Sequence, residues 1–438
     1  MVRGRAIAHG PLGVRRDRAR RRPGPRGGRS LPYRSRGHGV RRRCRRAGGG
    51  GVHAMSTGHW TTLGDLPWER NVFGAASGAV RLADGRVLLA GGADERLTAT
   101  AEAAVFTPTT GIWSPTAPLR TARRMHTMTV LADGRVLVTG GYGGPLSFPT
   151  RSLATAEVYD PETGHWTDTA PMERARCGHS ATLLPGGRVL VAGGIDRRSG
   201  DSDGTLASAE VYDPTGGGRW TTTGELADAR AHHPAVALPD GGVLVAGGWA
   251  VTDRSGSGSA ALAYCERYDP GTGTWAATAA FAAPRAGHQL TPLPDGSVLA
   301  TGGGPGGGIG PDGRVDPYSL ATAERYHPGP ATWTREPDMP CGRSLHRALL
   351  LLSGEVLVMG GSTEPLHDGG LSSAVRYDPL SRSWSPEAGM TVGRAEFAAV
   401  ALTDGRALVT AGTIRTGPST PSGGYHRLTC TSELFTPH

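Results

Sequence analysis

Short apolar runs alternate with turn residues along most of the chain, and no long helical pattern interrupts them. In the stretch HSATLLPGGRVLVAGG (179–194), HSATLL predicts one strand, the glycine-rich PGG predicts a tight turn, and GRVLVAGG predicts a second strand with an apolar run suited to burial. After a variable segment, text such as ATAEVYDP (154–161) predicts a third strand, which leads through a DPxTG turn into a fourth strand that begins at a tryptophan. The pattern therefore predicts four short antiparallel strands in each unit of an all-β fold.

This unit recurs with a regular period. The chain carries Gly-Gly pairs that begin at residues 91, 140, 193, 247, 302 and 360, and a degenerate Ala-Gly pair at 411. The intervals between them run from 49 to 58 residues, and six tryptophans each lie 27 residues before the next pair. Seven units with a period near 50 predict a seven-bladed β-propeller, in which each blade is a four-stranded sheet that cannot bury both of its faces alone.

The two ends of the repeat region are complementary. The last unit stops after TSELFTPH without a tryptophan strand, while the first tryptophan, Trp60, precedes any first strand. We therefore expect the segment around Trp60 to supply strand 4 of the last blade, which closes the ring and removes an open sheet edge. The expected propeller spans residues 55–438.

Residues 1–54 differ from the rest in charge. They contain 17 arginines and one acid, Asp17, and so carry +16, whereas the remainder carries −7; the formal net charge of +9 is the sum of two unlike parts. An arginine-rich segment without apolar periodicity predicts a disordered tail. The lysine-free, Arg- and Gly-rich composition favours Met55 as the native start, while a polybasic arm that binds nucleic acid or anionic lipid stays open as an alternative.

Targeting and cofactor patterns are sparse. No apolar signal region follows the arginines, and no apolar run of 18 residues predicts a membrane span. The five cysteines form no CxxC pair, which favours a reduced compartment over a zinc or disulfide framework. We expect a cytoplasmic monomer without a metal or other cofactor, and no nucleic-acid partner for the propeller itself.

The double glycine after an apolar strand, the Tyr-Asp-Pro of YDPETGHW (159–166) and the tryptophan that follows resemble kelch repeats. The resemblance covers residues 58–438 and implies a seven-bladed kelch propeller. For activity it implies less, because kelch propellers include both binding modules and enzymes.

Antiparallel strands place the short turns 1-2 and 3-4 on one face and the loops 2-3 and 4-1 on the other. The short turns repeat, whereas the 2-3 loops diverge in length and sequence; they span 142–155, 195–208, 249–263, 304–322 and 413–429. A repeat scaffold that varies on one face usually binds there. The sequence therefore predicts a binding face made by the 2-3 and 4-1 loops.

Strand 1 opens with a repeated Arg-x-x-His on that face. Counting back from each glycine pair gives arginines at 123, 176, 230, 285, 343 and 394 and histidines at 126, 179, 233, 288 and 346; Gly74 and Phe397 are among the exceptions. The innermost position of strand 1 predicts that this ring surrounds the channel mouth. Because a residue repeated in every blade usually does the same job in each, we expect most of them to bind the repeated strand-3 glutamates at 157, 210, 266, 324 and 433.

Ligand contacts are better sought where the repetition fails. Unit six has Val375 in place of the glutamate, so the sequence predicts a less neutralised Arg343. In kelch modules that present substrates to ubiquitin ligases, arginines at the matching place hold acidic side chains, and that resemblance implies a carboxylate or phosphate site at Arg343 with Arg285 and Arg394. The aromatic loop residues, which are candidates for apolar contacts, are Trp249, Tyr142, Tyr318 and Tyr425.

Two enzyme classes are alternatives to a protein-binding or small-anion-binding scaffold. A metal-free isomerase, lyase or cyclase would place an acid or base near an arginine at the mouth, and Glu324, His288, His346 and His426 are candidates. The copper radical oxidases, similar to galactose oxidase, need a Tyr-His pair that opens a strand 1. The two Tyr-His pairs of this chain, at 326–327 and 425–426, lie elsewhere in the repeat, which makes this the remote alternative.

Overall fold

The apolar run that ends at each glycine pair forms a fully buried strand, because it lies between two neighbouring sheets. The computed structural model describes residues 57–72, 78–144, 151–196, 204–251, 259–305, 319–363, 369–416 and 426–438. The predicted tail at 1–54 lies outside these residues. Within them the chain is almost entirely β, and η1 (Thr215–Gly217) is a single 3-10 turn.

Seven four-stranded antiparallel sheets follow one another, each ordered 1-2-3-4 from the axis outwards. Blades one to three are β2 (Ala79–Arg81), β3 (Val87–Ala90), β4 (Ala103–Thr107) and β5 (Ile112–Thr116); β6 (Thr127–Val130), β7 (Val136–Thr139), β10 (Ala156–Asp160) and β11 (His165–Thr169); and β12 (Ser180–Leu183), β13 (Val189–Ala192), β16 (Ala209–Asp213) and β17 (Arg219–Thr222). Blades four to six are β18 (Ala235–Ala237), β19 (Val243–Ala246), β22 (Cys265–Asp269) and β23 (Thr274–Thr278); β24 (Gln289–Pro292), β25 (Val298–Thr301), β26 (Ala323–His327) and β27 (Thr332–Glu336); and β28 (Arg347–Leu350), β29 (Val356–Met359), β30 (Ala374–Asp378) and β31 (Ser383–Glu387). Blade seven is β32 (Ala398–Ala401), β33 (Ala407–Thr410), β36 (Ser432–Thr436) and β1 (His59–Thr62).

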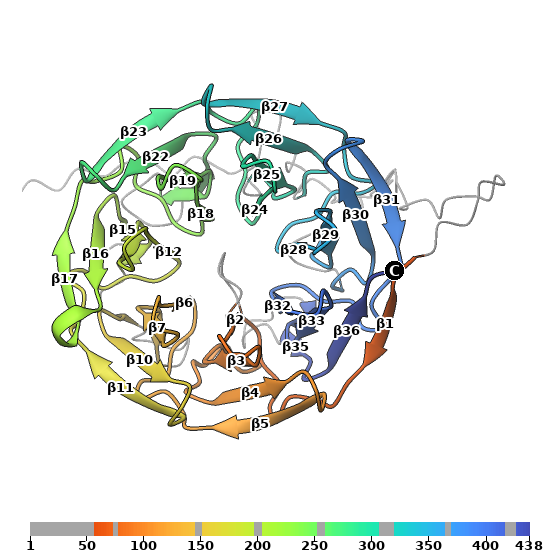
Figure 1. Cartoon of the computed structure of the whole chain (residues 1–438), viewed down its shortest axis with the longest axis horizontal. Coiled ribbons are helices and arrows are strands. Elements are labelled where there is room, and N and C mark those ends of the chain that lie inside the picture. The colour runs from red at the N-terminus through yellow and green to blue at the C-terminus, as the bar shows by residue number, and fades with distance from the viewer. Residues whose placement is uncertain are drawn as a thin grey trace, which may run out of the picture. The chain divides into compact units, whose positions relative to one another are not determined.

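The blades surround a central axis, with every strand 1 innermost and every strand 4 outermost (Figure 1). The core is divided into seven apolar clusters, each of which combines residues of two adjacent blades. The repeated tryptophan links neighbours as well: the Trp166 indole donates to the Ala117 carbonyl of the preceding blade at 2.8 Å. Each blade therefore depends on both neighbours for its burial. The prediction of a seven-bladed, four-stranded propeller is confirmed.

Blade seven closes with the N-terminal strand, as the sequence predicts. Strand β1 pairs with β36 in antiparallel register, with His59 opposite Thr436 and Thr62 opposite Glu433. The Trp60 indole donates to the Ala388 carbonyl at 2.7 Å, and its ring packs against Phe435 at 5.2 Å. The two ends of the propeller therefore share one sheet.

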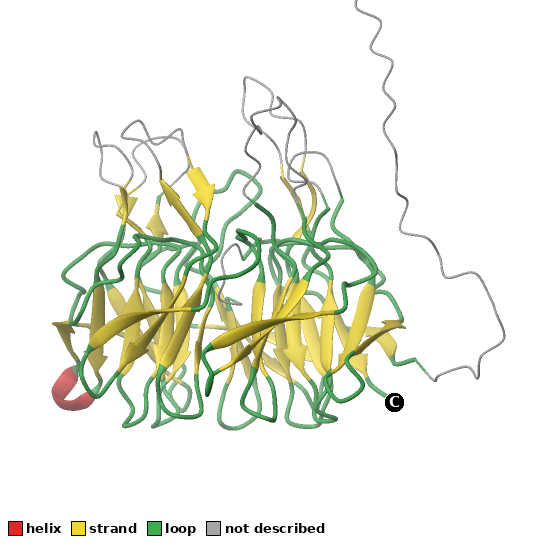
Figure 2. Cartoon of the chain, turned by 90° about the horizontal axis from the view of Figure 1, so that it is seen from above, coloured by secondary structure: helices red, strands yellow, loops and turns green. Residues whose placement is uncertain are grey.

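The ring has two unlike faces (Figure 2). We call the side of the 1-2 and 3-4 turns the turn face, and the opposite side the loop face. On the loop face, short hairpins rise above the blades: β8 (Tyr142–Gly143) with β9 (Arg151–Ser152), β14 (Ile195–Asp196) with β15 (Gly204–Thr205), β20 (Trp249–Val251) with β21 (Ser259–Ala261), and β34 (Thr413–Thr416) with β35 (His426–Leu428). Four segments expected to be plain 2-3 loops thus begin and end as paired strands.

The glycine pairs let the chain leave strand 2 towards these hairpins. Gly193 and Gly194 have φ angles of 64° and 100°, which side chains rarely allow. A Cβ on Gly194 would lie 2.8 Å from the Cys177 carbonyl oxygen, so the second glycine also permits a close approach of two backbones.

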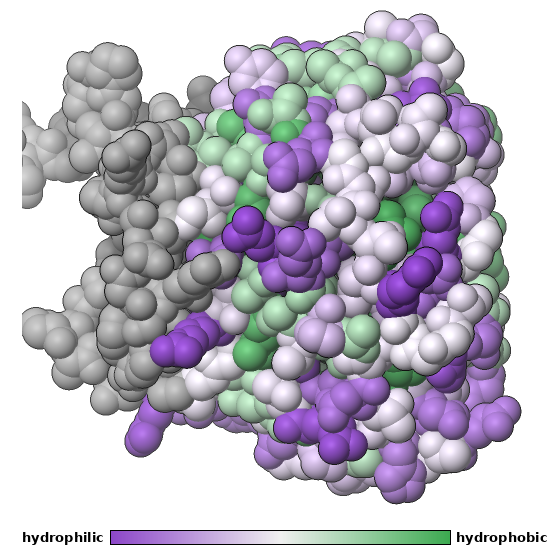
Figure 3. All heavy atoms as spheres, turned by 90° about the vertical axis from the view of Figure 1, so that its left-hand side faces the viewer, coloured by the Kyte–Doolittle hydropathy of each residue, from purple (hydrophilic) through white to green (hydrophobic). Residues whose placement is uncertain are grey.

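The outer wall on the side of β17 mixes hydrophilic and hydrophobic side chains, and its hydrophobic areas are small (Figure 3). In the part of the chain that the structure describes, no helix has the length and apolar character of a membrane span.

Candidate functional site

The loop face is held together at its base by short backbone bridges within each blade. The residue after the repeated arginine pairs with the residue after the glycine pair, as Ala231 does with Trp249: the two N–H groups donate to the opposite carbonyls at 2.8 and 2.9 Å. Each 4-1 loop is therefore fixed to the 2-3 loop of its own blade, and the two kinds of loop form one surface.

The repeated arginines lie beneath this surface and are fully buried. Arg176 shows the arrangement: its guanidinium donates to the carbonyls of Gly193 at 2.7 Å and Ser208 at 2.9 Å, and forms an ion pair with Glu210 at 2.7 Å. The same arginine–glutamate pair occurs as Arg123–Glu157, Arg230–Glu266, Arg285–Glu324 and Arg394–Glu433. The structural interpretation of these pairs is confirmed.

The partner glutamates also organise the 4-1 loops. The carboxylate of Glu157 accepts the backbone N–H groups of Arg120 at 2.7 Å and Thr121 at 3.0 Å. Burial lowers the pKa of Arg285 and of Arg394, and the paired glutamate in each case opposes that effect. Each pair thus joins strand 2, strand 3 and loop 4-1 of one blade through charge-assisted bonds.

Blade six replaces the glutamate by buried Val375. The Arg343 guanidinium donates to the carbonyls of Gly360 at 3.0 Å and Ser373 at 3.1 Å, and to the Ser373 hydroxyl at 3.2 Å. Its side chain is as buried as those of the other arginines. In Arg285, Arg343 and Arg394 alike, Nη1 donates to a backbone carbonyl at the end of strand 2. That these arginines bind an anion stays a prediction.

Blade one contains an arginine that counting along the sequence missed. Arg70, four residues before Gly74, is fully buried and donates to the carbonyls of Gly91 at 2.8 Å and Glu102 at 3.0 Å. Its own carbonyl accepts the N–H of Gly412, as the carbonyls of the other repeated arginines accept from the neighbouring glycine pairs. The ring therefore has seven arginines, and the expectation that Gly74 replaces one of them is wrong, because the inserted segment shifts the spacing.

The repeated histidines lie at the start of the innermost strands, but their side chains are buried between blades and are not exposed at the channel mouth. His346 is fully buried and its Nε2 lies 2.9 Å from the Thr301 hydroxyl of blade five, while His288 packs against the edge of Phe281 at 5.3 Å. Burial lowers the pKa of both far below the usual range of histidine. A role for His288, His346 or Glu324 in ligand binding or acid–base chemistry stays a prediction.

The aromatic candidates differ in position. Tyr142 is buried at the start of β8, where the Arg124 guanidinium lies over its ring at 5.3 Å. Trp249 stacks on His232 at 4.9 Å with an interplanar angle of 28°. Tyr318 and Tyr425 lie outside the described residues, as does the side chain of His426, whose backbone begins β35. Tyr142 and Trp249 thus stand at the hairpin bases.

A second ring of residues lies just before each strand 1 and is connected between blades by backbone hydrogen bonds. We call it the mouth belt; it consists of the residue that precedes each repeated histidine position, namely Met125, Gly178, His232, Gly287, Leu345 and Glu396. Backbone hydrogen bonds connect these residues from blade to blade, for example from His232 N–H to the Gly178 carbonyl at 2.7 Å. All six have positive φ, between 52° and 66°, although four are not glycine. Conformations that most side chains avoid often accompany functional positions.

The side chains of the belt are unlike one another. His232 leans over Gly178, where a Cβ would come within 2.7 Å of the imidazole. Met125 and Leu345 retain partial solvent exposure, as does Glu396, which is the belt's acid. At the belt positions the blades therefore share a backbone conformation but not a side-chain type. The belt could not be predicted from the sequence, because its residue types share no motif.

Glu396 combines burial with charged neighbours. The Thr413 hydroxyl donates to its Oε2 at 3.1 Å. Burial raises the pKa of Glu396 to about 7, against the opposing effects of the Thr413 hydrogen bond and of the guanidinium groups of Arg347 and Arg124. These neighbours come from blades seven, six and two, so they meet only in the folded ring.

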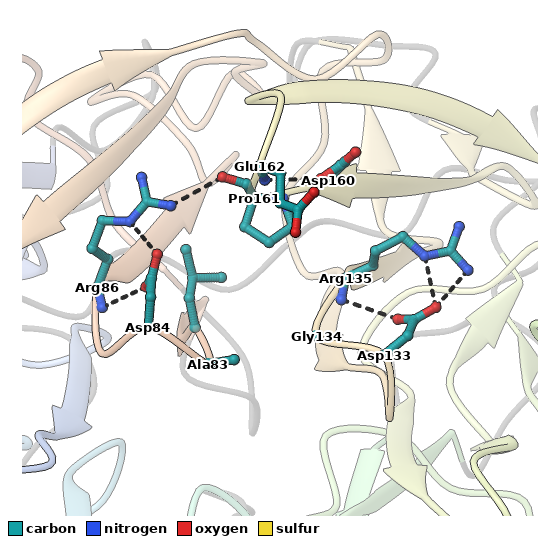
Figure 4. A pocket seen from close by; sticks show the side chains of 10 residues that line it. Ala83, Asp84, Arg86, Asp133, Gly134, Arg135, Asp160, Pro161 and Glu162 are labelled. Carbon is teal, nitrogen blue, oxygen red and sulfur yellow. Dashed lines mark hydrogen bonds and ion pairs between the residues drawn. The ribbon is translucent and has the colours of Figure 1, made fainter.

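A groove of about 570 Å³ lies on the turn face, between blades one and two (Figure 4). Its charges are largely paired within the turns: Arg86 binds Asp84 at 2.6 Å and Arg135 binds Asp133 at 2.7 Å. Arg86 also donates to the Pro161 carbonyl of the next blade at 3.0 Å. The side chains that line the groove therefore have structural contacts, one of which joins blades one and two.

Comparisons with known proteins agree with this architecture. The kelch motif family model matches residues 122–173. The chain is 24% identical to Kelch-like protein terF of Aspergillus terreus, over 63% of this chain and 56% of that protein. It is 33% identical to mouse Kelch-like protein 26 and 32% identical to human Kelch-like protein 34, in each case over 37% of this chain and 24% of the relative. The chain thus spans about half of the first relative and about a quarter of the others.

A solved structure shows the same fold. A fungal alcohol oxidase of the AA5 family, in complex with copper, superposes with a TM-score of 0.64 at 19% identity, over 87% of this chain and 77% of that one. The geometry and this likeness define the class of the protein as a seven-bladed β-propeller. Its repeats are similar to kelch repeats: residues 122–173 match the kelch motif, and the relatives that the chain resembles are Kelch-like proteins.

The copper of that oxidase has no matching donor set in the part of this chain that the structure describes. Those residues contain no group of three or more His, Cys, Asp or Glu side chains placed to hold a metal. Tyr326 and His327 end β26, where the Tyr326 hydroxyl pairs with Thr278 at 2.8 Å. The described residues therefore do not fit a copper centre built from such side chains.

Proposed function

We propose that this kelch propeller is a cytoplasmic, monomeric binding or scaffold module, whose loop face receives a protein partner or a small anionic ligand. The proposal rests on one observation: four hairpins of different sequence rise from that face, while the turn face keeps a short 1-2 turn of similar sequence in all seven blades. A rigid scaffold with variation confined to one side usually binds there. The similarity to Kelch-like proteins supports the proposal, because members of the kelch-repeat family are typically protein-binding scaffolds.

A matched pair of crosslinking positions tests the proposal. A photoreactive amino acid is placed at exposed Ala260 on β21 or at exposed Arg427 on β35, both on the loop face. The control positions are Leu380, which is 94% exposed, and Glu162, both on the turn face. We expect both loop-face positions to crosslink to the same partner in cells, identified by mass spectrometry and then reproduced with purified components.

The result separates the two faces. Crosslinks from Leu380 or Glu162, with none from Ala260 and Arg427, would place the binding surface on the turn face and overturn the proposal. Crosslinks to unrelated proteins from all four positions would show contact without recognition, and would overturn it as well.

A further inference from the structure

The repeat departs from its pattern in blade four, beside the buried Arg230. In five other blades, one residue at the end of loop 2-3 accepts from arginine Nη1 through its carbonyl and lies within hydrogen-bond distance of Nη2 through its hydroxyl. The hydroxyl distances run from 2.9 to 3.2 Å, and the residues are Thr155, Ser208, Thr322, Ser373 and Thr431. In blade four this residue is Tyr264, whose carbonyl accepts from Arg230 Nη1 at 2.8 Å. A tyrosine thus replaces a small hydroxyl residue that serves the fold elsewhere.

The side chain of Tyr264 is 59% exposed. Three other large hydrophobic side chains are exposed among the described residues, namely Ile112, Leu352 and Leu380, and they lie in or directly after turns of the turn face. In the part of the chain that the structure describes, Tyr264 is therefore the large apolar side chain that the loop face presents to solvent. A departure from the repeat that exposes a ring, with no gain for the fold, is typical of a functional position.

The backbone holds Tyr264 in place. The N–H of Gly247 donates to its carbonyl at 3.1 Å, and the carbonyl of the preceding Ala263 accepts from the N–H of Phe281 at 2.9 Å. Because this backbone is already fixed, covering the ring orders little more than the side chain itself. Rigid tyrosines of this kind are enriched among the residues that dominate the binding energy of protein interfaces.

Carboxylates lie beside this ring. The Asp228 carbonyl accepts from Arg230 Nε at 3.3 Å, so Asp228 and Tyr264 contact the same guanidinium. The charge of that guanidinium is matched by Glu266 at 2.7 Å. Asp228 is partly exposed and Glu225 of the same loop is exposed, and no ion pair between described residues uses either carboxylate. The surface at Tyr264 therefore combines an exposed aromatic ring with excess negative charge.

A guanidinium group fits this combination. It stacks on aromatic faces and donates charge-assisted hydrogen bonds to carboxylates, whereas an anion would be repelled here. The adjoining segments 259–264 and 279–284 contain no charged residue, so they offer no cation of their own to Asp228. The charge of the surface thus complements a basic partner.

We propose that Tyr264 anchors an arginine side chain of a protein partner, which stacks on the ring and pairs with the carboxylate of Asp228. The inference rests on the proposed function and narrows it: the ligand of the loop face at blade four is a protein segment with an exposed arginine.

Selection from a phage-displayed library of random peptides tests this with the full-length protein immobilised. We expect the selected peptides to be enriched in arginine. A selected peptide made with citrulline in place of that arginine should bind about tenfold more weakly, because the uncharged side chain loses both the ion pair and the cation–π contact. Fluorescence anisotropy measures the two affinities.

Tyr264→Thr is the decisive variant, because it restores the residue type found in other blades. It should bind the selected peptide about tenfold more weakly. Its melting temperature should equal or exceed that of wild type, since the new hydroxyl is placed to bind Arg230 as Thr155 binds Arg123. The loss of binding is then separated from any loss of folding.

Two further variants make the test specific. Asp228→Asn should weaken the selected peptide and reduce the dependence of its binding on salt, because one charge pair is removed. Ile112→Thr shortens an exposed apolar side chain at the other face, and it should bind the peptide as wild type does.

The inference is overturned if no peptide is selected, if the selected peptides are not enriched in arginine, or if Tyr264→Thr binds them as tightly as wild type. A citrulline peptide that binds as well as its arginine parent would overturn it too. In each of these cases, crosslinking to one partner from Ala260 and Arg427 would leave the proposed function standing.

Discussion

The buried arginines show how one side chain serves several elements at once. Each guanidinium of the type seen at Arg176 joins strand 2, strand 3 and a glutamate that in turn holds loop 4-1. Removing one partner of such a pair leaves an uncompensated buried charge, which typically costs about 3–5 kcal/mol. Blade six replaces its glutamate by Val375 and supplies Ser373 as a partner of the arginine. The repeat therefore keeps the arginine more strictly than the acid.

The histidine ring predicts a specific dependence of stability on pH. His288 is buried, and among the described residues neither of its ring nitrogens has a hydrogen-bond partner. Its folded pKa is lowered by burial, whereas an unfolded histidine takes up a proton near pH 6.5. The unfolded state therefore binds more protons below that pH, and the native state loses about 1.4 kcal/mol of stability per pH unit for this residue.

His288→Phe should remove that contribution, because blade seven already holds Phe397 at the same place with no exposure. We expect a melting temperature at pH 7.5 equal to or above that of wild type, and a gain that grows as the pH falls to 5, measured by circular dichroism. His179→Phe is the contrasting variant at pH 7.5, since it removes the partner of the Thr127 and Thr139 hydroxyls and should lower the melting temperature there. Burial lowers the pKa of His179 too, so the deficit of this variant should shrink as the pH falls. An unchanged pH slope in His288→Phe would contradict the assignment.

Residue positions were predictable where the repeat keeps its spacing and not where it changes. The arginine–glutamate pairs follow from fixed intervals, because identical blades place identical residues together. Arg70 was missed because the inserted segment moved it away from the counted position. The mouth belt that includes Glu396 could not be predicted, since backbone hydrogen bonds between blades define it and its residue types share no motif.

Strand β1 is the element on which closure depends. It adds four residue pairs to β36, the Trp60 contacts with Ala388 and Phe435, and a bond from the Gly58 N–H to Glu387 Oε2 at 2.9 Å. Without it, β36 becomes an exposed edge and the apolar cluster shared by blades six and seven loses the Trp60 ring. Burial of one large side chain and several backbone bonds amounts to roughly 5 kcal/mol.

A pair of shortened chains tests this closure. Protein that begins at Leu63 should melt at a clearly lower temperature and aggregate on heating, as followed by circular dichroism and light scattering. Protein that begins at Met55 keeps β1, and we predict that it melts at the temperature of the full chain. A lower melting temperature for the Met55 protein would show that residues 1–54 contribute to the propeller.

At the scale of elements the sequence was informative for the blades and poor for the hairpins. Strands such as β13 are buried apolar runs bounded by turn residues, so their positions follow from composition alone. Strands β8 and β14 contain two residues each, which is too short for an alternation of apolar and polar residues to be recognised. Their pairing depends on the glycine pair and on the backbone bridge at the hairpin base, which become visible only in the structure.

We expect the whole ring to unfold as one cooperative unit, because each of the seven apolar clusters combines residues of two adjacent blades. Blades two and three share one cluster, blades three and four share the next, and the cluster between blades seven and one completes the circle. Moving the chain termini to a new turn preserves every cluster and should therefore cost little stability. Loss of one blade disrupts two clusters and changes the angle between all neighbouring blades.

A circular permutant distinguishes these cases. His438 is joined to Thr57 through a short glycine linker, which is feasible because His59 pairs with Thr436. The chain is then opened between Gly216 and Gly217, in the exposed 3-4 turn of blade three. The new N-terminal strand is β17, so blade three closes as blade seven does natively, and we expect a single thermal transition near that of wild type.

Deletion of residues 176–229 removes one full repeat, and we expect it to abolish the cooperative transition, since a calorimetric enthalpy equal to the van't Hoff enthalpy requires the ring to unfold as a unit. A blade deletion that still melted cooperatively at the wild-type temperature would show that the blades are stable independently of their neighbours.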